Sequence, residues 1–236
     1  MMLDRIQHSV ETGEDGRKYT IVDGQAYVLD SITTNLRVIN SPELTAWMVK
    51  HGRDESNRLR DEGGSIGTMV HEAGVRLFTG NGYGSFEWSL LGHPTAGDER
   101  VRNAACALLL LMQERKLTQG DAEVFVWSKE RLFAGTLDKA EVFDDYADIY
   151  DWKTSDRIYP KVWMQLAAYA KAFTECYGIP VRRIYPVRLD RGLPTARSVK
   201  YDASLFKEGA DIDKAFEAYL HAQELGQFIK SEGGRY

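Results

Sequence analysis

The chain has 236 residues, 43% of them hydrophobic, and a formal net charge of −5 at pH 7. This length suits one large domain with a substantial core. The negative balance argues against a protein that coats nucleic acid indiscriminately, because phosphate affinity comes largely from Lys and Arg, although a local basic groove remains compatible with it. The longest apolar run, 104–112, is too short for a bilayer, and the N-terminus has no signal-peptide pattern. We therefore expect a cytoplasmic protein without membrane contact.

The first part of the chain predicts a β-hairpin followed by a helix. The segments 19–22 and 26–29 are rich in strand-forming residues and flank Asp23-Gly24, a pair typical of a tight turn between antiparallel strands. Ser41-Pro42 predicts a helix start, because serine caps helices and proline is tolerated in the first turn. We expect this helix to reach about Leu59.

A glycine-rich segment separates this part from the next. Gly63-Gly64-Ser65 predicts a break in the chain, because glycine disfavours the interior of a helix. The following segment, 66–78, has apolar positions at helical spacing and carries His71. After a glycine-rich loop at 80–84, the segment 98–116 is strongly apolar and predicts a helix of the core.

The second half of the chain predicts strands on both sides of one helix. Three successive strands are followed by a helix that begins at Tyr159-Pro160 and stops at Gly178, and then by another strand. A short strand paired with the latter, an amphipathic helix and a disordered tail complete the prediction. The segments are 123–127, 133–138, 147–152, 159–177, 182–189, 196–199, 204–228 and 231–236.

Two aspartates and a lysine lie at the ends of neighbouring predicted strands. Side chains of a strand alternate between its faces, so Asp151 and Lys153 emerge on the same side. Asp138 closes the preceding strand, and the short connection through Asp144-Asp145 makes the two strands antiparallel neighbours. Two close carboxylates repel unless a cation lies between them, and hard oxygen ligands suit Mg²⁺ or Mn²⁺. An isolated Asp-x-Lys is usually a surface ion pair, but Lys153 beside such a metal would stabilise negative charge on a phosphate.

Gln165 and Tyr169 share one face of the helix after these strands, because they are four residues apart. A tyrosine at such a position is ordinarily a half-buried core residue. Since this helix comes directly after the Asp-x-Lys strand, we favour contacts from both side chains to a DNA backbone or to the lysine.

The order and spacing of these motifs resemble one known family. Gly135-x-x-Asp138, Asp151-x-Lys153 and Gln165-x-x-x-Tyr169 resemble the RecB-like branch of the PD-(D/E)XK nuclease superfamily, and Gly67-x-x-x-His71 fits a motif that this family carries upstream. The resemblance covers about residues 65–190.

That resemblance implies a fold and a division of the chain. The implied fold is α/β, with a restriction-endonuclease-like αβββαβ core whose mixed central sheet is flanked by helices, and an N-terminal helical region. Within a single nuclease domain spanning 1–236, it assigns an N-terminal hairpin and helical part, a catalytic core, and a C-terminal helix and tail. These parts are 1–64, 65–190 and 191–236.

The resemblance also implies which residues act. Asp138, Asp151 and the main-chain carbonyl of Trp152 would hold the metal, and Lys153 would hold the scissile phosphate or position the attacking water. His71 would be a further ligand, although a lone helical histidine is usually solvated. An imidazole ligand favours Mn²⁺ over Mg²⁺.

Glu123 matches an acidic residue that often begins the first core strand in this family. It would either take part in catalysis by orienting a metal-bound water or only terminate the strand, and the sequence leaves both roles open.

The implied function is a metal-dependent DNA exonuclease. It would hydrolyse phosphodiester bonds from free DNA ends in recombination, repair or viral DNA processing, with Mg²⁺ or Mn²⁺ as cofactor and DNA and a recombination or replication protein as partners. The alternatives are a structure-specific endonuclease with the same site, an inactive DNA-end-binding subunit, and a structural protein in which the motifs are coincidental. Scattered basic residues are expected to converge into a short groove for a threaded strand: Arg58, Arg60, Lys161, Arg182, Arg183 and Arg188.

Overall fold

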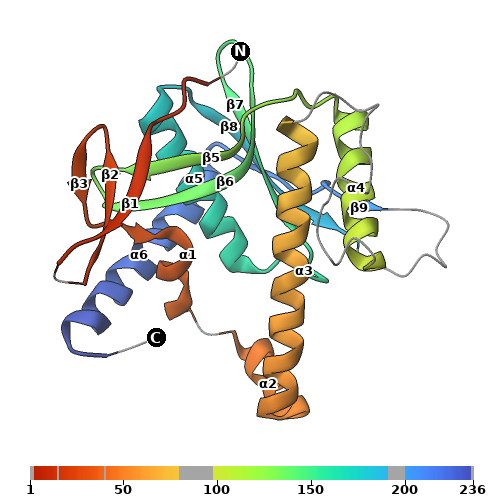
Figure 1. The fold of residues 1–236 in the computed structure, drawn as a ribbon, viewed down its shortest axis with the longest axis horizontal. Helices are drawn as coiled ribbons and strands as arrows, with labels where there is room; N and C mark the ends of the chain where they lie inside the picture. Colours follow the sequence, from red (N-terminus) through yellow and green to blue (C-terminus); the bar gives the residue numbers. More distant parts are fainter. Residues whose placement is uncertain (1–2, 15, 40, 80–97, 191–199, 235–236) are drawn as a thin grey trace.

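The protein has an α/β fold in which helices flank a mixed sheet (Figure 1). A computed structural model describes residues 3–14, 16–39, 41–79, 98–190 and 200–234. The predicted loop at 80–84, the predicted strand at 196–199 and residues 235–236 of the predicted tail lie outside the described residues. No helix in the described ranges has the length and apolar character needed to cross a membrane.

The elements follow the chain as a small N-terminal sheet, helices, a central sheet and a last helix. They are β1 (His8–Thr12), β2 (Lys18–Val22), β3 (Gln25–Tyr27), β4 (Asp30–Ser31), α1 (Ile32–Asn35), the 3₁₀ turn η1 (Leu36–Val38), α2 (Pro42–His51), α3 (Arg53–Thr79), α4 (Glu99–Arg115), β5 (Ala122–Ser128), β6 (Phe133–Val142), β7 (Ala147–Lys153), α5 (Pro160–Tyr177), β8 (Val181–Leu189), β9 (Tyr201–Asp202), β10 (Lys207–Glu208) and α6 (Ala210–Ser231).

The central sheet is organised around β6, β7 and β8. β5, β6 and β7 form an antiparallel meander, and α5 then crosses over so that β8 lies parallel to β7. The predicted order of three strands, a helix and a strand is therefore confirmed. Short strands extend the sheet: β4 pairs parallel with β6, while β9 and β10 pair antiparallel with β8.

β6 and β7 separate before either strand ends. Their pairing runs from Val142 to Lys139 of β6 and stops there. At the other end of β6, β4 pairs with Phe133 and Ala134. Because β5 occupies the opposite edge of β6, β4 lies on the same edge as β7. The edge of β6 from Gly135 to Asp138 thus pairs with neither β4 nor β7 among the described strands, and we call this opening the β6–β7 fork.

One hydrophobic core lies on each face of the central sheet. On one face, α1, α5 and α6 pack over β5, β6 and β7; on the other, α3 and α4 pack over β7 and β8 (Figure 1). Ile149 of β7 belongs to the first core and Trp152 to the second, as strand alternation requires. The fork therefore lies between helices of both layers.

The predicted helix break at Gly63-Gly64-Ser65 is wrong, because α3 continues through it. The chain turns instead at Gly52, whose φ of 76° lies in the left-handed region that glycine tolerates. A glycine inside a helix costs about 1 kcal/mol relative to alanine, but the C-terminal half of α3 buries Ile66, Val70 and Phe78. The burial outweighs the local preference.

Other boundaries agree with the prediction more closely. The β2–β3 hairpin turns at Asp23-Gly24, both with positive φ, and α5 starts at Pro160 and ends at Gly178, as predicted. The last helix starts at Ala210 rather than at 204, because Lys207–Glu208 pairs with β8 as β10. It also continues to Ser231, where the sequence predicted that disorder begins.

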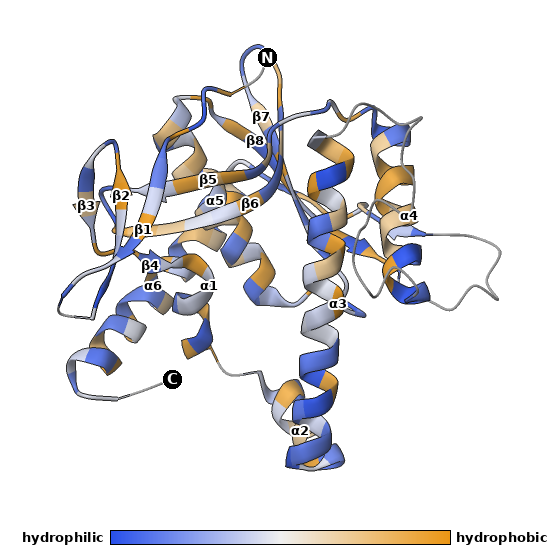
Figure 2. Ribbon diagram, in the orientation of Figure 1, coloured by the Kyte–Doolittle hydropathy of each residue, from blue (hydrophilic) through white to orange (hydrophobic). Residues whose placement is uncertain are grey.

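α2 and the N-terminal half of α3 project away from the sheet (Figure 1). No residue of α2 is buried, and Figure 2 shows mainly hydrophilic residues along the projecting half of α3. Since α3 runs through residues 64 and 65, no element boundary separates the predicted N-terminal part from the predicted core. The division into 1–64, 65–190 and 191–236 stays a prediction.

Candidate metal centre

β7 places Asp151 and Lys153 on one face, as its alternation predicted. Lys153 Nζ lies 2.5 Å from Asp151 Oδ2, and Asp151 is 1% exposed. The close contact lacks hydrogen-bond geometry, so Oδ2 has an ionic partner but no hydrogen-bond donor. The carboxylate is therefore buried with one of its oxygens incompletely satisfied, a feature that needs explanation in a folded protein.

Electrostatics at this pair favour additional positive charge. Burial raises the pKa of Asp151 to about 6 and repulsion from Asp138 adds to the rise, while Lys153 opposes it. Burial alone would lower the pKa of Lys153, but the Asp151 and Asp138 carboxylates outweigh it and raise that pKa. One ammonium thus serves two carboxylates, and a further cation would stabilise them both.

Asp138 lies in the fork and links three elements. Continuing the β6–β7 register one residue beyond the Lys139–Tyr150 pair would place Asp138 opposite Asp151. The Trp152 N–H donates to Asp138 Oδ2 at 2.6 Å, and His71 Nδ1 lies 2.9 Å from Asp138 Oδ1. Both oxygens of Asp138 are therefore oriented by the protein.

His71 reaches the fork because α3 packs closely on β7. A Cβ at Gly74 would lie 3.2 Å from Trp152 Nε1, so the absence of a side chain there permits this approach. The His71 side chain is 35% exposed, which leaves the ring accessible from solvent. Burial lowers the pKa of His71, but the carboxylates of Asp138 and Asp151 together outweigh this effect, and the pKa is raised.

Glu123 joins this group through an unusual backbone conformation. The pairs Ala122–Lys139 and Val124–Leu137 place it across from Asp138, and its φ is 50°. A non-glycine residue in this region costs about 1–3 kcal/mol, and such strain is concentrated at functional sites. Burial raises the pKa of Glu123, and repulsion from Asp138 raises it further.

The ligand atoms of His71, Glu123 and Asp138 lie within 4.8 Å of one another. One imidazole nitrogen and two carboxylate oxygens fit a divalent ion such as Mn²⁺ or Mg²⁺. Asp151, which the sequence placed among the ligands, is outside this group in the described residues and is paired with Lys153 instead. The N–H of Trp152 orients Asp138, and the predicted metal contact of its carbonyl stays a prediction.

Tyr169 does not have the exposure that its expected contact with DNA requires. It is 4% exposed, and a Cβ at Gly135 would lie 2.6 Å from its ring, so the tyrosine closes the fork from the α5 side. Gln165 Nε2 donates to Tyr169 Oη at 3.0 Å and lies 3.5 Å from Asp151 Oδ1. Gln165 therefore contacts Asp151, and Tyr169 holds Gln165 in that position. The sequence reasoning missed this role, although the glycine in Gly135-x-x-Asp138 was its available signal.

The expected groove of six basic residues is wrong for three of them. Arg58 pairs with Glu55 and Glu62 on α3 itself. Arg182 and Arg183 pair with Asp148 and Glu208 near the start of β8, at the far end of β7 from Lys153. Their charges are satisfied within the protein and away from the fork.

The sequence reasoning also missed a buried ion pair beside the fork. Lys139 directly follows Asp138, and its Nζ lies 3.2 Å from Glu141 Oε2. The Thr118 N–H contacts both oxygens of Glu141, at 3.1 and 2.9 Å. Charged residues within an apolar strand were the available signal.

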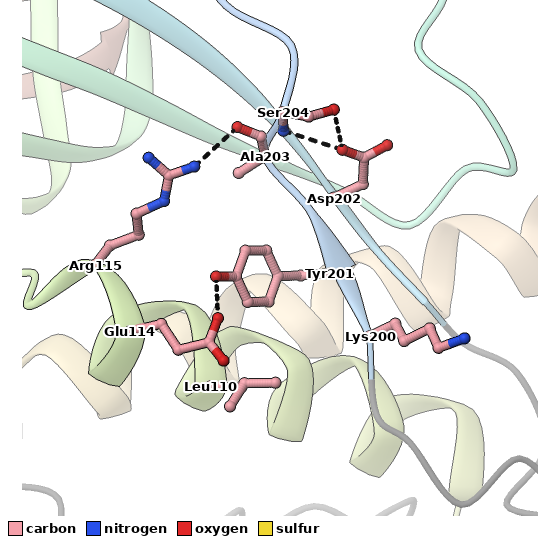
Figure 3. Close-up of a pocket in the computed structure, with 8 residues that line it drawn as sticks. All are labelled: Leu110, Glu114, Arg115, Lys200, Tyr201, Asp202, Ala203 and Ser204. Atoms are coloured by element: carbon pink, nitrogen blue, oxygen red, sulfur yellow. Dashed lines mark hydrogen bonds between the residues drawn. The ribbon is translucent and has the colours of Figure 1, made fainter.

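A separate cavity of about 380 Å³ lies between α4 and β9 (Figure 3). Tyr201 Oη donates to Glu114 on one side, and Arg115 Nη2 donates to Ala203 O at 3.2 Å on another. No member of the His71–Glu123–Asp138 group lines it, so the candidate metal centre is not part of this cavity.

Comparison of the chain with protein-family models and with curated proteins gave no match. The resemblance to RecB-like nucleases therefore stays a prediction from the motifs. Any function proposed for the chain depends on the geometry around the fork together with those motifs.

Proposed function

We propose that the protein is a metal-dependent deoxyribonuclease with a restriction-endonuclease-like core. The observation that carries the proposal is the β6–β7 fork, where three ligand side chains within 4.8 Å of one another adjoin the pair of buried Asp151 and half-buried Lys153. A metal group alone is common in proteins, and a half-buried lysine alone is compatible with many roles. Their juxtaposition suits hydrolysis of a phosphodiester, which needs both water activation and charge stabilisation.

His71, Glu123 and Asp138 would hold the ion, with Asp151 beside them. A bound Mg²⁺ or Mn²⁺ supplies Lewis acidity and lowers the pKa of a coordinated water. The nitrogen donor of His71 favours Mn²⁺ of these two. The fit rests on the donor types and on the excess of carboxylates over cations at the fork.

The protein's own groups supply position and charge. Lys153 is held by Asp151 at 2.5 Å and stabilises negative charge that develops on the phosphate. Gln165 contacts Asp151 from the α5 side, and Tyr169 holds Gln165 in place. The Trp152 N–H keeps Asp138 in place, so the carboxylate needs little reorganisation during the reaction.

We further propose that it acts as an exonuclease at free DNA ends, in recombination, repair or viral DNA processing. The net charge of −5 and the internal pairing of Arg58, Arg182 and Arg183 support this, because both leave little basic surface for the middle of a long duplex. The projecting α2 and the N-terminal half of α3 extend away from the sheet (Figure 1), and a strand that enters by its end would pass beside them.

The test compares end-labelled linear DNA, single- and double-stranded, with covalently closed single-stranded circles of the same sequence. Wild type and Asp138→Asn are incubated with Mn²⁺ or Mg²⁺, and product lengths are followed over time. We expect stepwise loss of linear DNA and intact circles with the wild type, and cleavage of linear DNA about 10³-fold slower with the variant. Equal loss of circles would move the protein to the endonucleases, and end binding without cleavage would make it a DNA-end-binding subunit.

A further inference from the structure

A basic residue of β8 lies directly beside Lys153. β7 and β8 are parallel, and Lys153 and Arg188 are Cα partners near the ends of the two strands. The preceding partners Trp152 and Val187 both belong to the core under α3 and α4. Because neighbouring strand residues in register share a face, Lys153 and Arg188 both emerge on the opposite face, together with Asp151.

The charge of Arg188 is not used by an ion pair within the described residues. The other two arginines of β8 differ: Arg182 pairs with Asp148, and Arg183 pairs with Glu208. Arg188 is half-buried, so its position is restricted by its surroundings.

The acidic neighbour of Arg188 on β9 is held by another residue. Asp202, the Cα partner of Arg188, accepts hydrogen bonds through Oδ1 from the Ser204 N–H at 3.0 Å and the Ser204 hydroxyl at 2.6 Å. Those bonds, and then the charge of Arg188, lower the pKa of Asp202. Asp202 therefore remains charged and attracts the guanidinium without a direct ion pair.

We infer that Arg188 binds the phosphate next to the scissile phosphate. This inference rests on the proposed nuclease function. Adjacent strands are about 4.8 Å apart, and the long arginine side chain covers the additional distance to a neighbouring phosphate of the same strand. The planar guanidinium binds phosphate oxygens in pairs, which fixes the register of the strand over Lys153. The substrate class is thus a polynucleotide rather than an isolated phosphodiester.

The test uses two substrates to distinguish contact with the scissile phosphate from contact with the neighbouring phosphate. Bis(4-nitrophenyl) phosphate contains only the scissile phosphodiester, whereas a single-stranded oligonucleotide also has its neighbours. Arg188→Ala should slow oligonucleotide cleavage about 10–100-fold, as expected for a lost charge-assisted hydrogen bond, and leave the small substrate unaffected. Arg183→Ala, on the same strand but paired with Glu208, is the matched control and should change neither rate.

A neutral methylphosphonate, placed on either side of the scissile linkage in turn, identifies the contact. At one of these positions it should slow the wild type by the factor that Arg188→Ala produces, and it should slow Arg188→Ala no further. The inference alone would be overturned if Arg188→Ala slowed the cleavage of both substrates equally or did not slow the cleavage of the oligonucleotide. It would also be overturned if the methylphosphonate slowed the wild type and Arg188→Ala by the same factor. If the wild type cleaved neither the oligonucleotide nor bis(4-nitrophenyl) phosphate, the proposed function would be overturned, and the inference with it.

Discussion

Two clusters of charged residues begin at adjacent positions of β6 and differ in almost every physical respect. The fork cluster contains Asp138 with His71, Glu123, Asp151 and Lys153. The closed cluster contains Lys139, Glu141 and the N–H of Thr118. Their residue types are similar, so composition does not distinguish a reactive group from a structural one.

In the closed cluster every charge is matched inside the protein. Lys139 is 0% exposed, its ammonium contacts Glu141 and the carbonyl of Ala140, and it lies over the ring of Phe78. Burial lowers the pKa of Lys139, and Glu141 only partly restores it. This cluster ties the connection between α4 and β5 to the sheet.

The fork cluster has excess negative charge and a path to solvent. Its carboxylates repel one another, Asp151 Oδ2 has no hydrogen-bond donor, and the His71 ring is 35% exposed. Glu123 also has a positive φ, a strained conformation for a non-glycine residue. Charged groups that lack partners within the protein and are accessible to solvent therefore indicate a binding site. Charged groups whose partners all lie within the protein indicate a structural role.

We expect the largest effect when one half of the ion pair in the closed cluster is removed. Glu141→Ala should lower the free energy of unfolding by about 3–5 kcal/mol, because it leaves the Lys139 ammonium buried without its partner. Urea unfolding monitored by circular dichroism measures the change. The double variant Lys139→Met, Glu141→Leu should recover most of the loss. Normal stability together with lost cleavage would instead assign Lys139 and Glu141 to the site.

Asp138→Asn should affect cleavage strongly and stability little, the reverse of Glu141→Ala. The amide keeps an oxygen for the Trp152 N–H, so stability should change little, but cleavage should fall about 10³-fold because metal catalysis is worth several kcal/mol. Calorimetric titration with Mn²⁺ should show weakened binding. The matched control is Asp148→Asn, a buried aspartate at the other end of β7 that pairs with Arg182, and it should retain activity. Full activity of Asp138→Asn would remove Asp138 from the centre.

Local patterns predicted the parts of the site that depend on one strand or one hairpin. Alternation along β7 was enough to place Lys153 beside Asp151, and the short connection to β6 was enough to bring Asp138 near them. By contrast, Glu123 was a candidate only through the family resemblance, because it enters the group through a positive φ that no residue pattern encodes. Local patterns also failed for α3, because they do not include tertiary packing. Its glycines predict a break, but Ile66 and its neighbours pack against α4 and keep the helix continuous.

Gly135→Ala, at the fork itself, should have an intermediate effect on both stability and cleavage. The new methyl would lie 2.6 Å from Tyr169 Cε1 and 3.2 Å from Ile32 Cδ1, so the ring must move. Overpacking of this kind costs about 1–3 kcal/mol, and displacement of Tyr169 should also loosen Gln165 and slow cleavage. Thermal unfolding and cleavage rates are compared with those of Tyr169→Phe, which keeps the ring but loses the hydrogen bond. A fully stable, active Gly135→Ala would show that the fork tolerates movement of the ring.

The smallest expected effect concerns Gly67, which lies one helical turn before His71. A Cβ there would meet only Thr154 Oγ1 at 3.8 Å, an ordinary contact, so nothing in the fold requires glycine. Gly67→Ala should raise the free energy of unfolding by about 0.5–1 kcal/mol through the better helix propensity of alanine. Gly63→Ala, with nothing within 4 Å of the new methyl, should give the same gain and serves as the control. If Gly67 keeps the approach to Lys153 open, only Gly67→Ala should also slow the cleavage of oligonucleotides, while bis(4-nitrophenyl) phosphate is cleaved as by the wild type. Equal activity of both glycine variants would show that this face of α3 is outside the path of the substrate.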